Sequence, residues 1–292
     1  MTIYNLGSIN LDHFYQLPRL PAPGETVATG GYSTGLGGKG ANQSVAAARA
    51  GARVLHVGAT GEDGDWALQR LESYGVDATN IACVEIPTGH AIINVDAAGE
   101  NTIVIFPGAN RTQSPEAIAR ALEAASPSDT LLLQNETSHQ VEAARLAREA
   151  GMRVIYSAAP FDIDAVRAVL PHASLLVMNA VEARQLRDTL GQELSELPVK
   201  GVVVTRGGEG AEWISAGSEP VFAPAFAVKP VDTTGAGDCF TGFLAAALDA
   251  GRPPAEAMRF AAAAAALQVT RPGTADAMPS RDEVDSFLEQ QA

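Results

Sequence analysis

The sequence predicts an α/β protein whose doubly wound, mostly parallel sheet carries helices on both faces. Short runs rich in Val, Ile and Leu recur along the chain, at residues 53–57, 130–133, 153–156, 174–178 and 201–205. Helical patterns lie between them; residues 139–151 are apolar on one face at a 3.6-residue period and end in glycine. This alternation favours a parallel sheet, in which ligand-binding residues are expected at the carboxyl ends of the strands.

Two segments interrupt the alternation and together predict a small β-sheet lid. Residues 11–34 are rich in Pro and Gly, and residues 88–106 contain two apolar runs around AAGE, which is typical of a β-hairpin. The predicted division is therefore an α/β domain of residues 1–10, 35–87 and 107–292, and a β lid of residues 11–34 and 88–106. Ordinary surface decoration is the alternative interpretation of the two segments.

Composition favours a small-molecule partner. The chain has 292 residues, with 20 Lys and Arg against 34 Asp and Glu and a net charge of −14, which disfavours nucleic acid and anionic membranes as partners. Cys83 and Cys239 form no metal-ligand spacing, and neither a leader-like N-terminus nor eighteen consecutive apolar residues occur. We expect a cytoplasmic protein in which the alanine-rich run 261–267 is a buried helix.

A glycine-rich loop precedes a predicted helix at residues 41–50. GLGGKG matches G-x-G-x-x-G, but a dinucleotide site needs a buried strand just before it and an acidic residue about twenty positions on, where Leu55 stands. A P-loop is also excluded, because Lys39 is followed by Gly40. The loop allows close approach of a ligand, with Lys39 and Asn42 as side-chain donors. A tight turn needed only for packing is the alternative.

Three polar side chains near predicted strand ends are candidates for binding a polyol. Asn10 and Asp12 follow the first apolar run and, being two residues apart, point the same way. Glu136 follows the run TLLLQN and can accept a hydrogen bond from another hydroxyl. Taken singly, the first pair is also typical of an Asx turn, and Glu136 of a charge at a helix N-terminus.

Two later turns follow predicted strands and could meet phosphate oxygens. NAVE spans Asn179 to Glu182, and TRGGEG spans Thr205 to Gly210. Hydroxyl and backbone N–H groups in such turns bind phosphate. NAVE is equally a capping box, with an N-cap asparagine and a glutamate three residues later.

The stretch VDTTGAGDCF is the strongest candidate for chemistry. Gly235, Ala236 and Gly237 open a predicted helix and offer N–H groups to developing negative charge, while Asp238 can take a proton from a hydroxyl nucleophile. An N-cap aspartate is the alternative for Asp238, but it does not explain the glycines.

The motifs together resemble the ribokinase-like, or PfkB, carbohydrate kinase family, and within it the ribokinases. SINLDH, GGKGAN, PGAN, NAVE, VTRGGEG, DTTGAGD and VTRPG occur in the order and spacing of that family over essentially the whole chain. The resemblance implies ATP-dependent, Mg²⁺-assisted phosphorylation of a sugar hydroxyl, here O5 of D-ribose. Asp238 would be the general base, and Gly235, Ala236 and Gly237 would form the anion hole.

The resemblance also implies binding roles, position by position. The sugar would contact Asn10, Asp12, Gly38, Lys39, Gly40, Ala41, Asn42, Glu136 and Asp238. The nucleotide would contact Asn179, Thr205, Arg206, Gly207, Gly208, Glu209, Gly210 and Gly237, with Glu182 organising the water shell of Mg²⁺. A monovalent cation, K⁺, would lie at Asp232, Thr234, Gln268, Arg271 and Gly273. A homodimer would form through the lid.

Two departures from the family pattern and three rival functions stay open. Ala277 replaces the usual serine near the cation, and Ala262 replaces a His or Asn near the adenine. A kinase for fructose, a keto-sugar or a nucleoside is one rival, although Asn10, Asp12 and Glu136 together favour ribose. An NAD-dependent oxidoreductase and a catalytically silent sugar-binding protein are the others.

Overall fold

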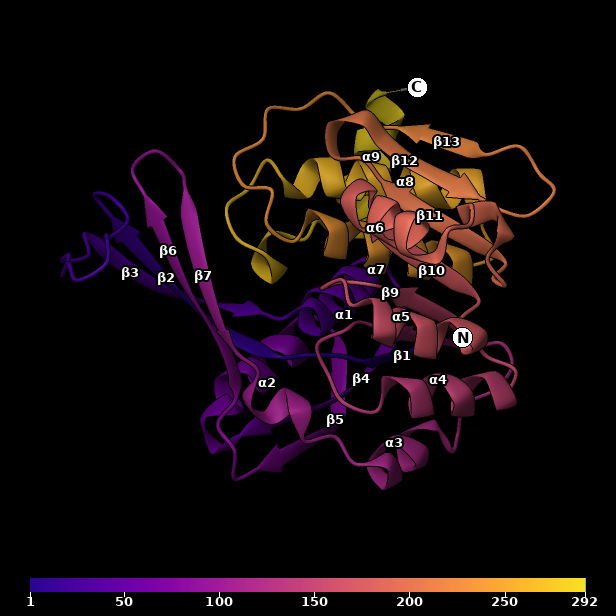
Figure 1. The fold of residues 1–292 in the computed structure, drawn as a ribbon, viewed down its shortest axis with the longest axis horizontal. Coiled ribbons are helices and arrows are strands. Elements are labelled where there is room, and N and C mark those ends of the chain that lie inside the picture. The colour runs from indigo at the N-terminus through magenta and orange to yellow at the C-terminus, as the bar shows by residue number, and fades with distance from the viewer. Residues whose placement is uncertain (292) are drawn as a thin grey trace.

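The computed structural model describes residues 1–291 and contains a large sheet of nine strands in the order β13-β12-β11-β10-β9-β8-β1-β4-β5 (Figure 1). Its strands are β1 (Thr2–Leu6), β4 (Arg53–Gly61), β5 (Val76–Val84), β8 (Thr130–Leu133), β9 (Arg153–Ser157), β10 (Leu175–Asn179), β11 (Gly201–Thr205), β12 (Gly210–Ile214) and β13 (Val221–Pro224). All pairs from β5 to β11 are parallel, and β12 and β13 add antiparallel pairs at one edge. The mostly parallel sheet is confirmed, and each of the five predicted apolar runs lies on a strand.

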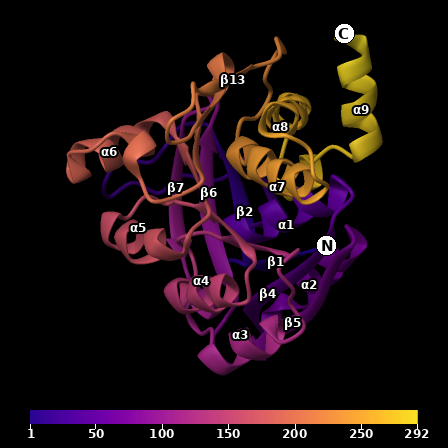
Figure 2. The same cartoon turned by 90° about the vertical axis from the view of Figure 1, so that its right-hand side faces the viewer.

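Helices cover both faces of this sheet (Figure 2). They are α1 (Lys39–Arg49), α2 (Asp65–Ser73), α3 (Pro115–Leu122), α4 (Gln140–Glu149), α5 (Ile163–Val169), α6 (Ala180–Leu190), α7 (Ala236–Asp249), α8 (Pro254–Gln268) and α9 (Arg281–Gln290). Successive residues of β1 belong to two separate cores: Ile3 lies in the core that includes residues of α1, α7 and α8, and Tyr4 in the core that includes residues of α3 to α6. This is the doubly wound architecture that the alternation predicts.

The alanine-rich stretch lies in α8, where Ala261, Ala263 and Ala264 are fully buried against α7. Its prediction as a buried helix is confirmed. Within residues 1–291, no helix combines the length and the apolarity that crossing a membrane requires.

A second, four-stranded sheet stands off the body, as Figure 1 shows at the left. Its strands are β2 (Asn10–Leu17), β3 (Gly31–Gly37), β6 (Gly89–Asp96) and β7 (Asn101–Phe106), in the order β3-β2-β6-β7. β2 and β6 are parallel, and the outer pairs are antiparallel. The predicted hairpin is present as β6 and β7. Because β2 begins at Asn10 and β3 ends at Gly37, this sheet reaches slightly beyond the segment 11–34.

The parallel register brings the carboxyl ends of the central strands together. Leu6 pairs with Leu133, and Asn179 pairs with Thr205, so the turns after β1, β8, β10 and β11 open at one edge. The first turn of α1 lies at the same edge, because Ala41 N donates to Ser8 O at 2.8 Å. α1 begins at Lys39, so the predicted start at residue 41 is wrong, and Lys39 and Gly40 belong to the helix rather than to the loop.

Candidate functional site

Asp238 lies in the first turn of α7 and is only 8% exposed. Both of its carboxylate oxygens accept hydrogen bonds from α1: Oδ2 from Asn42 Nδ2 at 3.0 Å and Oδ1 from Gln43 Nε2 at 2.9 Å. These bonds fix the carboxylate where α1 and α7 pack together. Each oxygen keeps lone-pair capacity for one further donor.

The start of α7 has free capacity for an anion. Its N-cap is Gly235, which has a φ of 79°, a left-handed conformation that glycine adopts without a Cβ penalty, and no side chain of residues 1–291 caps the helix. The N-cap interpretation of Asp238 is therefore wrong, because Asp238 stands three residues into the turn. The helix dipole favours negative charge at Gly235, Ala236 and Gly237, although the N–H of Ala236 also donates to Thr233 O at 3.3 Å.

Lys39 supplies a positive charge beside this turn. The carboxylate of Asp238 is the main reason why the pKa of Lys39 is raised above its ordinary value, and Glu136 and Glu182 act in the same direction against the effect of burial. Lys39, Glu182 and Asp238 line one cavity of about 170 Å³, together with Asn179, Thr205, Gly235, Ala236 and Gly237. The structure thus brings together groups from α1, β10, β11 and α7.

Among the buried acceptor atoms at this edge that have no hydrogen-bond partner within residues 1–291, two lie outside the cluster of amide side chains below Asp238. They are Asp12 Oδ1 on β2 and Asn42 Oδ1 on α1, and both side chains are almost wholly buried. A buried acceptor without a donor is costly, so such atoms indicate a ligand that brings donors. A polyol has hydroxyl donors suited to both.

The environment of Asp12 is crowded and buried. A Cβ on Gly37 would lie 2.0 Å from Asp12 Oδ2, so only glycine leaves room for the carboxylate there. Burial, with the charge of Glu136 adding to it, raises the pKa of Asp12 to about 7. Asn10 is also buried, and its Oδ1 accepts from Asn110 Nδ2 at 2.8 Å.

Glu136 connects the turn after β8 to the start of α1. Its Oε2 accepts from Ser8 Oγ and, at 3.0 Å, from the backbone N–H of Lys39. Because both of these donors meet Oε2, the carboxylate is oriented by the scaffold. Gly38, Gly40 and Ala41 complete this turn, with Gly40 N donating to Ser8 Oγ at 3.2 Å.

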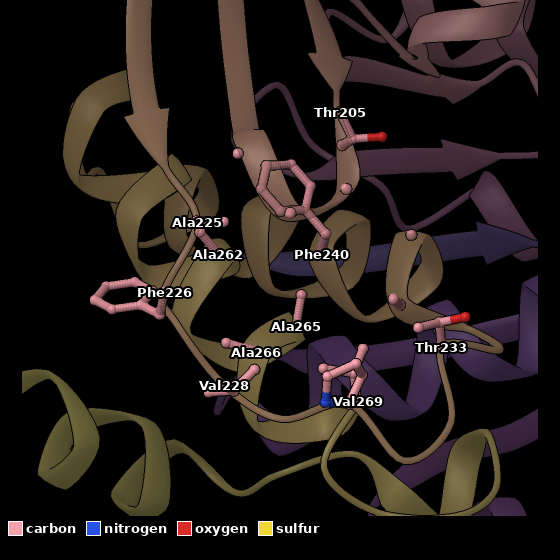
Figure 3. Close-up of a pocket in the computed structure, with 16 residues that line it drawn as sticks. Thr205, Ala225, Phe226, Val228, Thr233, Phe240, Ala262, Ala265, Ala266 and Val269 are labelled. Atoms are coloured by element: carbon pink, nitrogen blue, oxygen red, sulfur yellow. The ribbon is translucent and has the colours of Figure 1, made fainter.

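A larger, mostly apolar cavity of about 340 Å³ lies next to the smaller one (Figure 3). Its walls are the turn Gly207, Gly208 and Gly210, the side chains of Ala225, Phe226, Val228 and Phe240, and the α8 residues Ala262, Ala265 and Ala266. The two cavities share Thr205, Thr233, Ala236 and Gly237. Together they accommodate a flat apolar group with an anionic tail that ends at α7.

Arg206 and Glu209, both predicted to contact nucleotide, do not line this cavity. The guanidinium of Arg206 pairs with Glu212 on β12 at 2.6 Å, and Glu209 is an exposed residue of the turn. Asn179 and Glu182 do form the capping box: Asn179 Oδ1 accepts from the N–H of Glu182 at 2.9 Å, and Glu182 Oε2 accepts from that of Asn179 at 2.8 Å.

The capping role leaves Glu182 at the wall of the smaller cavity, where burial raises its pKa above the usual range. Within residues 1–291 no three His, Cys, Asp or Glu side chains gather as a metal site. Mg²⁺ in phosphoryl-transfer sites needs only one or two carboxylates, with phosphates and water as its other ligands. The residues present fit Mg²⁺ held in that way.

The predicted monovalent-cation residues are only partly together. Asp232 accepts from the N–H groups of Thr234 and Gly273, at 2.9 and 3.0 Å. Gln268 Nε2 donates to the carbonyls of the same two residues, at 2.9 and 3.1 Å. The side chain of Arg271 turns away and pairs with Glu283 on α9.

Several supporting residues carry signals too weak for sequence reasoning. Gln43 and Asn110 lie inside the GGKGANQ and PGAN motifs, but nothing local indicates which atoms they bind. Ser8, Asn5 and Gln134 are buried polar residues at the ends of β1 and β8, and their partners are distant in sequence.

Comparison with known proteins gives consistent matches along the whole chain. A model of the pfkB family of carbohydrate kinases matches residues 3–281. Ribokinase of Bacillus subtilis is 37% identical over 292 residues, covering 97% of this chain and 98% of the relative. Deoxyribokinase of Salmonella typhi is 33% identical, covering 99% of both chains. The structure of Arabidopsis thaliana ribokinase complexed with ribose and ATP superposes with a TM-score of 0.86 at 31% identity, over 99% of this chain and 98% of that one.

The protonation of Asp12 makes stability depend on pH. Since its pKa is about 7 in the folded chain against 3.8 ordinarily, the folded chain holds a proton that the unfolded chain has lost between those values. The free energy of unfolding then falls as pH rises through this range, by at most about 1.4 kcal/mol per pH unit. Asp12→Asn should remove this slope in urea titrations between pH 5 and 8. Asp282→Asn on α9 is the control, and parallel curves for Asp12→Asn and wild type would contradict the assignment.

Proposed function

The chain belongs to the pfkB family of carbohydrate kinases, and on that basis we propose that it transfers the γ-phosphate of ATP to O5 of D-ribose, giving D-ribose 5-phosphate. One observation carries the proposal: the buried carboxylate of Asp238, in the first turn of a helix without a side-chain cap, is held by Asn42, whose Oδ1 is, like Asp12 Oδ1, a buried acceptor without a partner within residues 1–291. Ribokinases are among the relatives that match over nearly their whole length.

ATP would occupy both cavities. The base fits between Phe226, Val228 and the alanines of α8, and the phosphates run past Thr205 to the start of α7. Ala262 offers no polar group to the base, so recognition there depends on shape and backbone atoms. The ATP and ribose named for the Arabidopsis relative support this arrangement.

Ribose would lie between the lid and α1. Asp12 Oδ1 and Asn42 Oδ1 accept from sugar hydroxyls, and Asn10 and Glu136 are oriented to add further bonds. Each matched hydroxyl relieves a buried acceptor, which favours a polyol over an apolar ligand. Leu11 and Phe14 alone give little apolar wall for the base of a nucleoside.

In the proposed reaction, Asp238 takes the proton from the attacking hydroxyl while the N–H groups of Gly235, Ala236 and Gly237 stabilise charge on the transferring phosphoryl group. Lys39 balances charge where the two substrates meet. Mg²⁺, when bound, neutralises phosphate charge, and Glu182 would orient its water shell.

We place the enzyme in the cytoplasm, where the free thiols of Cys83 and Cys239 stay reduced.

Asp238→Asn tests the base directly. The amide keeps the size of the side chain but cannot accept the proton, so kcat should fall by about 10² to 10⁴-fold, the usual contribution of a general base. The KM values for sugar and ATP should change far less. Steady-state kinetics with coupled ADP detection measure both, and a kcat within about threefold of wild type would exclude Asp238 as the base.

A substrate panel tests the proposed function itself. With ATP and Mg²⁺, D-ribose should give the highest kcat/KM among D-ribose, 2-deoxy-D-ribose, D-fructose and adenosine. Deoxyribose is included because a deoxyribokinase is among the matching relatives. A clear preference for fructose or adenosine would replace ribose by that substrate, and no ADP release with any of them would refute the kinase proposal.

We propose that K⁺ binds weakly beside Asp232. The Gln268 amide already donates to the carbonyls of Thr234 and Gly273, and Ala277 brings no hydroxyl. K⁺ should therefore stimulate kcat/KM of the wild type by less than about threefold, since it competes with bonds already made. In the Gln268→Ala variant, kcat/KM should rise more than in the wild type when K⁺ replaces Tris as the monovalent cation of the buffer. Strong stimulation of the wild type would contradict this.

We also propose a homodimer that forms through the lid. β7 exposes consecutive apolar side chains, with Val104 64% and Ile105 57% exposed, at the open edge of the small sheet. Such an edge favours pairing with a second copy. Val104→Lys should shift the dimer toward monomer in light scattering, whereas Phe222→Lys, at an equally exposed apolar site on β13, should not. A monomeric wild type would contradict the proposal.

A further inference from the structure

A continuous set of buried polar side chains lies beneath Asp238. Asn5 on β1, Gln43 and Ser44 on α1, and Gln134 after β8 are each at most 1% exposed. Gln43 Nε2 donates to Asp238 Oδ1, and Gln134 Nε2 donates to Gln43 Oε1 at 2.8 Å and to Asn5 Oδ1 at 3.0 Å. The set joins the catalytic carboxylate to the first strand of the large sheet.

The orientation of each amide in this set is dictated by a backbone carbonyl. Asn5 Nδ2 donates to the carbonyl of Gly40 at 2.8 Å, and a carbonyl can only accept. Asn5 Oδ1 is then the atom left to accept from Gln134, whose second N–H reaches Gln43 Oε1. Gln43 therefore turns its NH₂ group, and not its oxygen, toward Asp238.

Reversal of any one amide would set oxygens against each other. If Gln134 flipped, its Oε1 would face both Asn5 Oδ1 and Gln43 Oε1. Gln134 keeps the observed orientation although its own Oε1 has no partner within residues 1–291. The orientation that leaves Gln134 Oε1 unpaired is therefore also the one in which Gln43 donates to Asp238.

A second series of hydrogen bonds leads from Asn5 through Ser44 and His56 and also ends at a backbone carbonyl. Asn5 Nδ2 also donates to Ser44 Oγ, which lies 2.8 Å from His56 Nδ1, and His56 Nε2 donates to the carbonyl of Gly7 at 3.0 Å. Burial lowers the pKa of His56 to about 4, so the ring is neutral at ordinary pH. The set therefore adds no charge beside Asp238.

We infer that Gln43 is a positioning residue for the reaction, and that Gln134 and Asn5 act on Asp238 only through the orientation of the Gln43 amide. The inference rests on the proposed role of Asp238. The amide N–H holds Oδ1 in place and stabilises the ionised carboxylate, yet it neither gives up nor accepts a proton. The reacting hydroxyl then meets a base whose orientation is fixed.

Gln43→Met is the first test, because it preserves length and removes the donor. We expect kcat to fall by about 10 to 100-fold, as misplacement of a reacting group does, with KM for sugar and ATP changed by less than about threefold. The acidic limb of kcat against pH should move to higher pH, since a carboxyl that loses a donor keeps its proton more firmly. Lys39 and Glu182, the other charged groups facing Asp238, are unchanged in this variant.

Gln113→Met is the matched control, because Gln113 is equally a buried glutamine but its Nε2 donates to no atom of residues 1–291. It should keep the wild-type kcat and pH profile. A Gln43→Met enzyme with kcat within twofold of wild type and an unmoved acidic limb would overturn the inference.

Gln134→Met tests the inference if Gln43→Met does not fold. Gln134 bonds to Gln43 and not to Asp238. If its role were only local packing, the variant would have lower thermal stability but a normal kcat and pH profile, and this result would also overturn the inference. We expect instead a fall in kcat of about 3 to 10-fold and the same direction of shift in the acidic limb. A wild type that phosphorylates no sugar would refute the proposed function, whereas an active wild type with normal Gln43→Met and Gln134→Met variants would refute only this inference.

Discussion

The burial of one carboxylate, Asp238, is the constraint on which the site depends. An ionised group in this position loses its water and must be compensated by donors and by positive charge. Asn42 and Gln43 provide the donors, Lys39 provides the charge, and the start of α7 adds its dipole. The side-chain compensation named here comes from α1, almost two hundred residues earlier in the chain, so the carboxylate is compensated where the two glycine-rich motifs meet.

In the proposed reaction, the contact between α1 and α7 would also organise the two substrates. The apolar cavity and the turn after β11 lead toward the start of α7, and Asp12 on β2 and Asn42 on α1 each carry a buried acceptor that has no partner within residues 1–291. Phosphoryl transfer depends on alignment and charge stabilisation more than on covalent chemistry. In that reaction the fixed carboxylate of Asp238 would supply the alignment, and closure of the lid would exclude water.

Sequence patterns predicted the buried strands, which depend on local composition. They did not predict the hydrogen-bond partners of side chains that are distant in sequence. The five apolar runs are strands because central parallel strands are buried on both faces. β12, β13 and β5 were not predicted, since their partly exposed residues alternate irregularly and form no apolar run. NAVE could be interpreted as a cap or as a ligand site, and Glu182 both caps α6 and lines the cavity. The partners of Gln43 and Gln134 lie about ninety or more residues away, a distance at which no periodicity carries information.

The position of the new phosphate on the sugar tests the central claim most directly, because in the proposed reaction Asp238 would deprotonate only the hydroxyl that the small sheet and α1 hold against it. The wild-type enzyme would be incubated with ATP, Mg²⁺ and D-ribose, and the product examined by phosphorus–proton correlation NMR. The account predicts coupling of the phosphorus to the two protons on C5. Coupling to a single ring proton, as in a 1-phosphate, would place another hydroxyl at Asp238 and contradict it.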